Sequence, residues 1–432
     1  MTTMHKVIDG TTLEGGGGLV RAAITYSSLL NTPVRLHSIR ANRPNVQGLQ
    51  RGHSTAIGAM THFTAASVEG NQPYSRDLEF TPHAGTAVID SQPPNELEVT
   101  VEGSASIFLI AVLPYLLFSR LAAASFRFTP TFDGIEEIHL KIHAGMLVLN
   151  APSAYYMRQV FIPTLDRIGI TKQHLRFTSE CQQGWYNEGS DPINLPGKLV
   201  ALVKPLSDPI RGFVFGSRGE VRKIQVTAHA PIRALPTFRR ILKAEVKEAI
   251  LTDKYEVEIG FDFIEGIPEN QYHLLLTAIT ASPVSYLGYE LIYPQNKRFP
   301  ESIKGDEEGI ATYLARACIR GLWKELRTGN SVDEHMEDIL TIYQTMAVGF
   351  SSTIAKDHHM QVEEFSEEHI ALGSDGELYD VDTSSIHQET SWWIAKHMAG
   401  IDLEEKIIDG RVRPGCFGVS IGEKMSPEQE MP

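Results

Sequence analysis

The chain opens with an alternation of apolar and polar residues that changes to helical periodicity across a run of glycines. Residues His5–Asp9 alternate as in a short strand, Gly15–Gly18 follow, and the next apolar side chains recur at helical spacing. These apolar positions are Leu19, Ala22, Ala23, Tyr26, Leu29 and Leu30. The pattern predicts a strand, a glycine turn and a helix, and the free N–H groups at such a helix entrance favour an anion such as phosphate. A flexible turn is the alternative that the glycines alone leave open.

Two similar groups of elements follow from the pattern. The first continues with a strand at Val34–Arg40, a helix at Thr55–Ala66 and a strand at Asp77–Thr81. The second has a strand at Glu96–Val101, an apolar helix from Ser104, a strand at Ser125–Phe128 and a helix around Tyr155–Ile168. Together they look like two copies of one α/β unit, although no residue-level repeat joins them.

The pattern of hydrophobic and polar residues changes between residues 207 and 300. Strand patterns at Lys223–Ala228 and Tyr255–Phe263 flank a basic helix at Thr237–Ile250. Helical stripes then resume, and one helix opens with Ser331 and Glu334 at capping-box spacing. On that helix, His335 and Asp338 lie three positions apart and can face one cleft, although an ordinary exposed carboxylate is the alternative for Asp338. A strand is expected at Glu377–Val381, and His387 and Thr390 lie before the last apolar helix.

Charge is unevenly distributed along the chain. The 432 residues carry a formal net charge of −14, whereas the first 53 contain six basic and two acidic residues, a local charge of +4. Arg40, Arg43, Arg51 and His53 lie in a segment with no acidic residue, and the planar fork of arginine suits phosphate oxygens. The acidic balance argues against nonspecific coating of nucleic acid, so any RNA contact is expected to be confined to a basic cleft.

Composition also bounds the location and the number of domains. With 42% hydrophobic residues, a chain of this length can bury more than one core. The three cysteines are far apart, without the spacing of a zinc site, which fits a reducing compartment. The N-terminus lacks the apolar region of a signal peptide, and the run Ile107–Phe118 is too short to cross a bilayer, so it predicts a buried helix. The expected location is the cytoplasm or the nucleus, with no membrane partner.

A polar stretch in the last quarter of the chain invites a metal interpretation. It contains Asp357, His358 and His359 and is followed by four glutamates and His369. The residues lack ligand-like spacing on a defined element, so a solvated insertion is the simpler interpretation.

Two segments resemble the signatures of the RNA 3′-terminal phosphate cyclase family. Residues 8–21 (IDGTTLEGGGGLVR) resemble the pattern DGxxxEGGGQxLR, and residues 39–56 (IRANRPNVQGLQRGHSTA) resemble IRAGRxxPGLxxQHL. The residues 103–106 resemble the family's GSAGS, and His387 with Thr390 fits the segment that carries the family's nucleophile. The departures at polar or backbone-sensitive positions are Gly18 for Gln, Asn42 for Gly, Gly52 for Gln and His335 for Tyr.

The resemblance implies an α/β (α+β) fold in which three repeated βαβαβ-type units form a large domain and a smaller αβ domain is inserted in the third. It places the large domain at residues 1–206 and 301–423, and the inserted domain at 207–300. The units are then 1–95, 96–182, and 183–206 plus 301–423, with a tail at 424–432.

The resemblance also implies an enzyme that uses ATP and a divalent metal, Mg or Mn, to convert an RNA 3′-terminal phosphate to a 2′,3′-cyclic phosphate. His387 is the implied catalytic nucleophile, forming a covalent histidine–AMP, and an imidazole that is mainly neutral near pH 7 has a ring nitrogen available. Glu14 is the implied metal ligand. The implied nucleotide, phosphate and RNA-end ligands are Gly15, Gly16, Gly17, Arg21, Arg40, Arg43, Arg51, His53, Asp338 and Thr390.

The implied partner is RNA with a 3′-phosphate end, and no DNA partner is expected. Two alternatives remain: a catalytically inactive cyclase-like protein in RNA processing or ribosome assembly, and an enolpyruvyl-type small-molecule transferase. Relatives of the inactive kind generally lack the glycine signature and the histidine, and this chain has both. The transferase alternative predicts no nucleophilic histidine in the third unit. No Walker-type phosphate loop is present.

Overall fold

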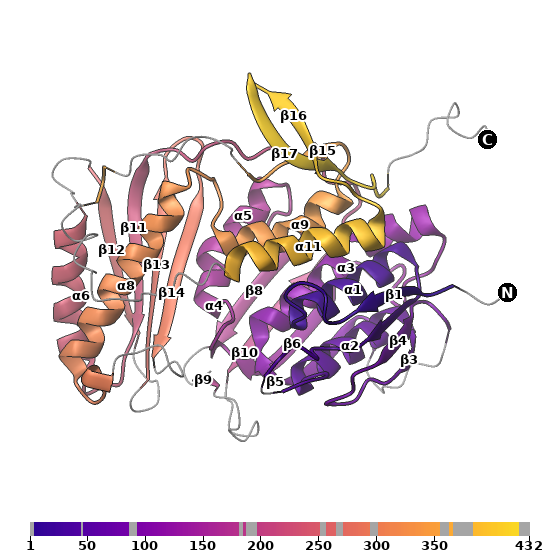
Figure 1. The fold of residues 1–432 in the computed structure, drawn as a ribbon, viewed down its shortest axis with the longest axis horizontal. Coiled ribbons are helices and arrows are strands. Elements are labelled where there is room, and N and C mark those ends of the chain that lie inside the picture. The colour runs from indigo at the N-terminus through magenta and orange to yellow at the C-terminus, as the bar shows by residue number, and fades with distance from the viewer. Residues whose placement is uncertain are drawn as a thin grey trace.

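Figure 1 shows the computed structural model of the chain, in which two sheet-and-helix bodies lie side by side. The structure describes residues 4–44, 46–85, 93–180, 185–186, 197–250, 256–264, 271–293, 301–354, 363–365 and 383–422. The predicted strand at Glu377–Val381, the tail at 424–432 and most of the polar stretch from Asp357 to His369 lie outside these residues.

The first sheet has the strand order β1-β2-β4-β3. Strands β1 and β2 are parallel and are joined by helix α1, whereas β4 is antiparallel to β2 and to β3. The elements are β1 (Lys6–Asp9), α1 (Gly17–Leu30), β2 (Val34–His37), α2 (Arg51–Thr64), β3 (Ser67–Glu69) and β4 (Leu78–Thr81). The strand, glycine turn and helix predicted at the start of the chain are confirmed.

The second sheet has the order β5-β6-β10-β8, with β5 and β6 parallel and the other neighbours antiparallel. This order and these directions match those of the first sheet; the threefold repeat itself stays a prediction. The strands are β5 (Glu96–Ser104), β6 (Ile138–Gly145), β8 (Leu175–Glu180) and β10 (Lys198–Val203), and β7 (Leu147–Val148) pairs with β9 (Trp185–Tyr186). The helices are α3 (Ala105–Phe126), α4 (Ala154–Tyr156), the π-helix η1 (Met157–Phe161) and α5 (Ile162–Arg167).

Helix α3 corrects one prediction and confirms another. The predicted strand at Ser125–Phe128 is wrong, because α3 continues through three alanines to Phe126 and ends at Arg127 in the left-handed region. Helix α3 is long and apolar enough to cross a membrane by length and composition, but most of its side chains are buried in the core. The expected buried helix is therefore present and longer than the apolar run alone indicated.

A separate sheet with the order β12-β11-β13-β14 forms the other body, at the left of Figure 1. Its elements are β11 (Val221–His229), α6 (Leu235–Ala249), β12 (Glu258–Ile264), β13 (Tyr272–Thr280), β14 (Tyr286–Tyr293), η3 (Glu301–Ile303) and α8 (Glu307–Arg327). It has its own apolar core, into which α8 places Leu314, Cys318 and Leu322. The sequence interpretation had grouped α8 with the large domain, but its apolar stripe is buried against this sheet; the domain boundaries themselves stay a prediction.

The remaining elements return to the first core. They are α9 (Glu334–Met346), β15 (Phe350–Ser351), α11 (Thr383–Ala399), β16 (Glu404–Ile408) and β17 (Arg411–Phe417), with the sheet order β15-β17-β16. Helices α9 and α11 lie side by side across the front of Figure 1. The predicted cap at Ser331 is corrected: the N-cap of α9 is Asp333, whose carboxylate accepts the N–H of Met336 at 3.0 Å, while Ser331 donates its hydroxyl to the carbonyl of Gly216.

Candidate functional site

The glycine turn between β1 and α1 brings bare backbone to the entrance of a helix. Gly15 has φ +57, and Gly16 is the N-cap of α1 without a side-chain cap. A Cβ on Gly16 would overlap the carboxylate of Glu14, and a Cβ on Gly17 would overlap the ring of His53 and lie 2.8 Å from Arg21 Nη1. The absence of side chains therefore lets these three functional groups converge on the first turn of α1.

Glu14 lies in the centre of this convergence. Its Oε1 forms an ion pair with Arg43, and its Oε2 lies at an ion-pair distance of 3.6 Å from Nδ1 of His387. Burial raises the pKa of Glu14, but His387 and two arginine side chains outweigh burial and hold that pKa below its ordinary value. Among the described residues, Oε2 has no hydrogen-bond partner although it is buried.

Helix α11 carries the other half of the site. Thr390 accepts the backbone N–H of Glu14 at 3.2 Å, which ties the glycine turn to this helix. At the far end of α11, the Lys6 ammonium donates to the carbonyls of His397 and Met398 at 2.7 and 2.9 Å. Strand β1 therefore holds the C-terminal end of α11 while the turn that follows β1 holds its N-terminal half.

His387 is more basic than an isolated imidazole. Glu14 raises its pKa, burial lowers it less, and Asp338 adds to the increase. Two carboxylates therefore stabilise the protonated ring relative to an isolated imidazole. The mainly neutral imidazole expected near pH 7 stays a prediction. With Nδ1 facing Glu14, Nε2 is the ring nitrogen that is free to meet a substrate. The side chain is 48% exposed.

A buried basic group surrounds the helix entrance. Burial lowers the pKa of Arg21, and the charges of Glu14 and Asp338 raise it by a smaller amount. Burial, together with the charges of Arg21 and Arg40, lowers the pKa of His53 to about 3, so this ring is neutral. His53 Nδ1 accepts the backbone N–H of Gln50 at 3.1 Å, which leaves Nε2–H as a donor at the entrance. The arrangement presents cationic and neutral donors to an anion.

Arg51 points away from this group. Its guanidinium pairs with Glu102 on β5 at 3.0 Å, and its side chain is 59% exposed. Arg40 donates to the carbonyl of Val46 while lying close enough to Arg21 and His53 for their charges to interact. Arg21 and Arg43 therefore interact with Glu14, and Arg40 with Arg21, whereas Arg51 pairs with Glu102.

Sequence reasoning missed two side chains that order the site. Ser391 donates its hydroxyl to Asp338. Burial raises the pKa of Asp338, and this hydrogen bond lowers it part of the way back. Ser391 could have been found from the sequence because it lies four positions after His387, a spacing that places both side chains on one face of a helix. Asn42, at a position where the family pattern has glycine, donates its amide to the carbonyl of Thr11 at 2.9 Å and so braces the glycine turn.

The residues present fit a nucleotide phosphate better than a metal bound by protein alone. Glu14, His53 and Arg21 approach the Gly16–Gly17 backbone so closely that no Cβ would fit there. The first N–H groups of α1 lack partners within the helix, and such a helix entrance suits a phosphate. Within the described ranges, no group of three His, Cys, Asp or Glu side chains is placed to hold a metal. Glu14 Oε2 offers a single carboxylate oxygen, which is the kind of ligand that Mg²⁺ takes together with waters and substrate phosphates.

Comparisons with known proteins agree on one family. The family model for RNA 3′-terminal phosphate cyclase matches residues 12–404. The chain belongs to the RNA 3′-terminal phosphate cyclase family. A cyclase of that name from Desulfurococcus amylolyticus is 30% identical over 352 residues, covering 80% of this chain and 85% of the relative. One from Sulfolobus acidocaldarius is 30% identical over 346 residues, covering 79% and 88% respectively.

The family resemblance expected from the sequence is thus confirmed, and so is the mixed α/β class of the fold. The match to the cyclase family extends from before Glu14 to beyond Thr390. Its range therefore spans the glycine turn, the arginine segment, α9 and α11, and the structure brings these four segments to one site.

Proposed function

We propose that this protein converts an RNA 3′-terminal phosphate to a 2′,3′-cyclic phosphate, at the expense of ATP and through a covalent adenylate on His387. The observation that carries the proposal is the ion pair of His387 with Glu14 at the entrance of α1. It places the His387 ring beside Glu14, which directly precedes the glycine turn, and faces Nδ1 rather than Nε2 toward the carboxylate. Membership of the cyclase family supports the reaction class.

We assign a different role to each ring nitrogen. Nδ1 faces Glu14 Oε2 at an ion-pair distance of 3.6 Å, which favours a proton on Nδ1, so deprotonation at Nε2 leaves a lone pair there. Nε2 attacks the α-phosphorus of ATP, the bond to the bridging oxygen of the β-phosphate breaks, and pyrophosphate leaves. Covalent transfer divides one difficult substitution into easier ones.

The RNA end then takes the adenylate from His387. An oxygen of the 3′-phosphate attacks the adenylate phosphorus, and the N–P bond breaks with its electron pair returning to Nε2. The adjacent 2′-hydroxyl loses its proton and attacks the 3′-phosphorus, which closes the cyclic phosphate and releases AMP. The described guanidinium groups of Arg21, Arg40 and Arg43 would offset the negative charge on these phosphates. A divalent cation held at Glu14 would supply further charge neutralisation.

The test is incubation of the protein with ATP labelled in the α-phosphate and with Mg²⁺ or Mn²⁺, followed by denaturation. We expect an acid-labile, alkali-stable label that is absent in His387→Ala. His397→Ala is the matched control, because His397 lies on the same helix but stacks on Trp393 away from Glu14. A folded wild-type protein that takes up no label with either metal would overturn the proposal in favour of a non-catalytic family member.

A further inference from the structure

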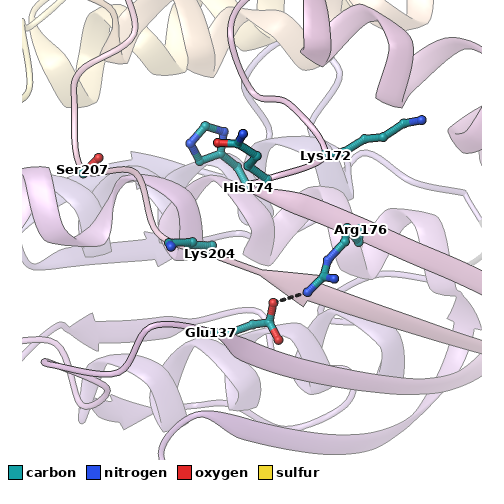
Figure 2. A pocket seen from close by; sticks show the side chains of 7 residues that line it. Glu137, Lys172, His174, Arg176, Lys204 and Ser207 are labelled. Carbon is teal, nitrogen blue, oxygen red and sulfur yellow. Dashed lines mark hydrogen bonds and ion pairs between the residues drawn. The ribbon is translucent and has the colours of Figure 1, made fainter.

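Two adjoining cavities lie away from His387, at the edge of the second sheet. One, of about 520 Å³, is bordered by Lys172, His174, Arg176 and Lys204, as Figure 2 shows. The other, of about 420 Å³, shares His174 and Ser207 with the first and continues along residues 206–213. We call this continuous hollow the basic groove.

The basic groove is strongly cationic in an acidic protein. Its lining includes five lysine and arginine side chains, against Glu137 and Asp208. Glu137 is already paired with Arg176, as the dashed line in Figure 2 marks. Lys172 and Lys204 are exposed, and neither forms an ion pair with a residue that the structure describes. Excess positive charge is therefore available to a ligand from outside the chain.

Charged side chains can also protect the edge of a sheet from pairing with another chain, but this explains only part of the positive charge in the basic groove. Strand β8 is an edge strand, and a charged side chain such as Arg176 discourages edge-to-edge pairing. Lys172 and Lys204, however, lie before β8 and after β10, outside the ladder of either strand. His174 adds a neutral donor, because its Nδ1 accepts the N–H of Thr171 at 3.3 Å and leaves Nε2–H for the groove.

The lining indicates the kind of ligand. The residues that line the first cavity include no Phe, Tyr or Trp, the large aromatic side chains on which bases usually stack, and its donors are ammonium, guanidinium, imidazole, amide and hydroxyl groups. Such groups contact phosphate oxygens without reading bases. Two adjoining cavities also favour a strand with successive phosphates over a single small anion.

The groove and the reaction centre lie at opposite ends of the second sheet. Glu137 directly precedes β6. At the other end, a Cβ on Gly52, the neighbour of the site residue His53, would lie 3.1 Å from the carbonyl oxygen of Glu102, near the end of the parallel strand β5. The eight residues of β6 span about 25 Å. That distance corresponds to about seven stacked nucleotides at about 3.4 Å each.

We propose that the basic groove binds the phosphodiester backbone of the RNA strand whose 3′ end is processed at His387. The inference rests on the proposed function for the identity of the ligand. It makes this groove a sequence-independent holding site, several nucleotides upstream of the reacting phosphate.

The test compares binding of two 3′-phosphorylated RNAs, a dinucleotide and a strand of about 20 nucleotides, which is longer than the estimated separation. The variant is Lys172→Glu with Lys204→Glu. The control is Lys247→Glu with Lys324→Glu, which makes the same change in net charge at exposed positions on α6 and α8. Fluorescence anisotropy at several salt concentrations gives the Kd and its salt dependence.

We expect the groove variant to bind the long RNA about tenfold more weakly, with a salt slope smaller by about 1.4 because two phosphate contacts are lost. Dinucleotide binding and His387 labelling should stay at the wild-type level. An unchanged Kd for the long RNA, or an equal loss in the control, would overturn the proposal and leave the groove for an acidic protein surface. Length-dependent binding without labelling would overturn the proposed function alone and support the groove.

Discussion

The backbone N–H of Glu14 donates a hydrogen bond to the hydroxyl of Thr390, across 376 positions of sequence. This bond joins the glycine turn to the helix that carries His387. Because Glu14 also faces the His387 ring, the same residue is fixed to α11 through its backbone and through its side chain. The position of His387 relative to the glycine turn thus depends on Glu14.

Replacement of Thr390 by valine should loosen that connection. The change keeps the shape of the buried side chain but leaves the N–H of Glu14 without its acceptor, at a cost of about 1–3 kcal/mol in the free energy of unfolding. Urea denaturation measures this loss, and the labelling rate of His387 should fall with it. Thr61→Val is the control, since Thr61 only bonds back to its own helix at Ile57. Equal effects in both variants would contradict the connection.

Gly17 and Gly18 should respond in opposite ways to a methyl group. A Cβ at Gly17 meets His53 and Arg21, so Gly17→Ala should abolish labelling of His387. A Cβ at Gly18 meets only Glu14 Oε2 at 3.7 Å, so Gly18→Ala should retain labelling and stabilise α1 by about 0.5–1 kcal/mol. Rates of label uptake and thermal unfolding of the two variants provide the measurement. A tolerated Gly17→Ala would show that the helix entrance does not hold the phosphates.

Local patterns predicted what lies within one stretch of chain. The spacing of apolar residues around Gly15–Gly18 was enough for the strand, the turn and the helix. The pairing of Arg51 with Glu102 could not be predicted in the same way, because it depends on how α2 meets a strand of another sheet. Arg40, Arg43 and Arg51 look alike in the sequence, whereas their partners are set by tertiary packing.

The pKa of a side chain and the packing partner of a helix also depend on tertiary contacts that the sequence does not show. The raised pKa of His387 comes from Glu14 and Asp338, which lie in two other segments of the chain. The apolar stripe of α8 was visible in the sequence, but the sheet that buries it was not, because a stripe does not identify its partner. The sequence therefore predicted which segments form the site, but not which side chains contact each other within it.

Arg43 and Arg51 provide a matched test of this distinction. Arg43 pairs with the half-buried Glu14, so Arg43→Ala should lower the labelling rate of His387 about a hundredfold, as expected when a donor is lost from a charged site. Arg51 forms an exposed pair with Glu102, so Arg51→Ala should change that rate less than about threefold. Labelling at saturating ATP and the Kd of a 3′-phosphorylated dinucleotide separate chemistry from binding. The reverse ranking would return Arg51 to the catalytic cleft.

Glu337 on α9 should make the stability of the protein fall as the pH rises. Burial, with contributions from Asp333 and Glu334, raises its pKa from 4.5 to about 8. A carboxyl group with a higher pKa in the folded than in the unfolded chain binds its proton more tightly when folded. Its contribution to stability is therefore complete below about pH 4.5 and is lost as the pH rises toward about 8.

The free energy of unfolding, measured in urea at intervals between pH 5 and about pH 9, should therefore decline, with at most about 1.4 kcal/mol per pH unit from this group. Glu337→Gln should flatten the decline, because the amide does not titrate. The substitution should also lower stability at acid pH, since Asn330 and Gln388 each donate to a different oxygen of the Glu337 carboxyl group and an amide offers one oxygen. Glu389→Gln, at an exposed position on α11, should retain the wild-type slope. If Glu337→Gln kept that slope as well, the decline would have to come from another group.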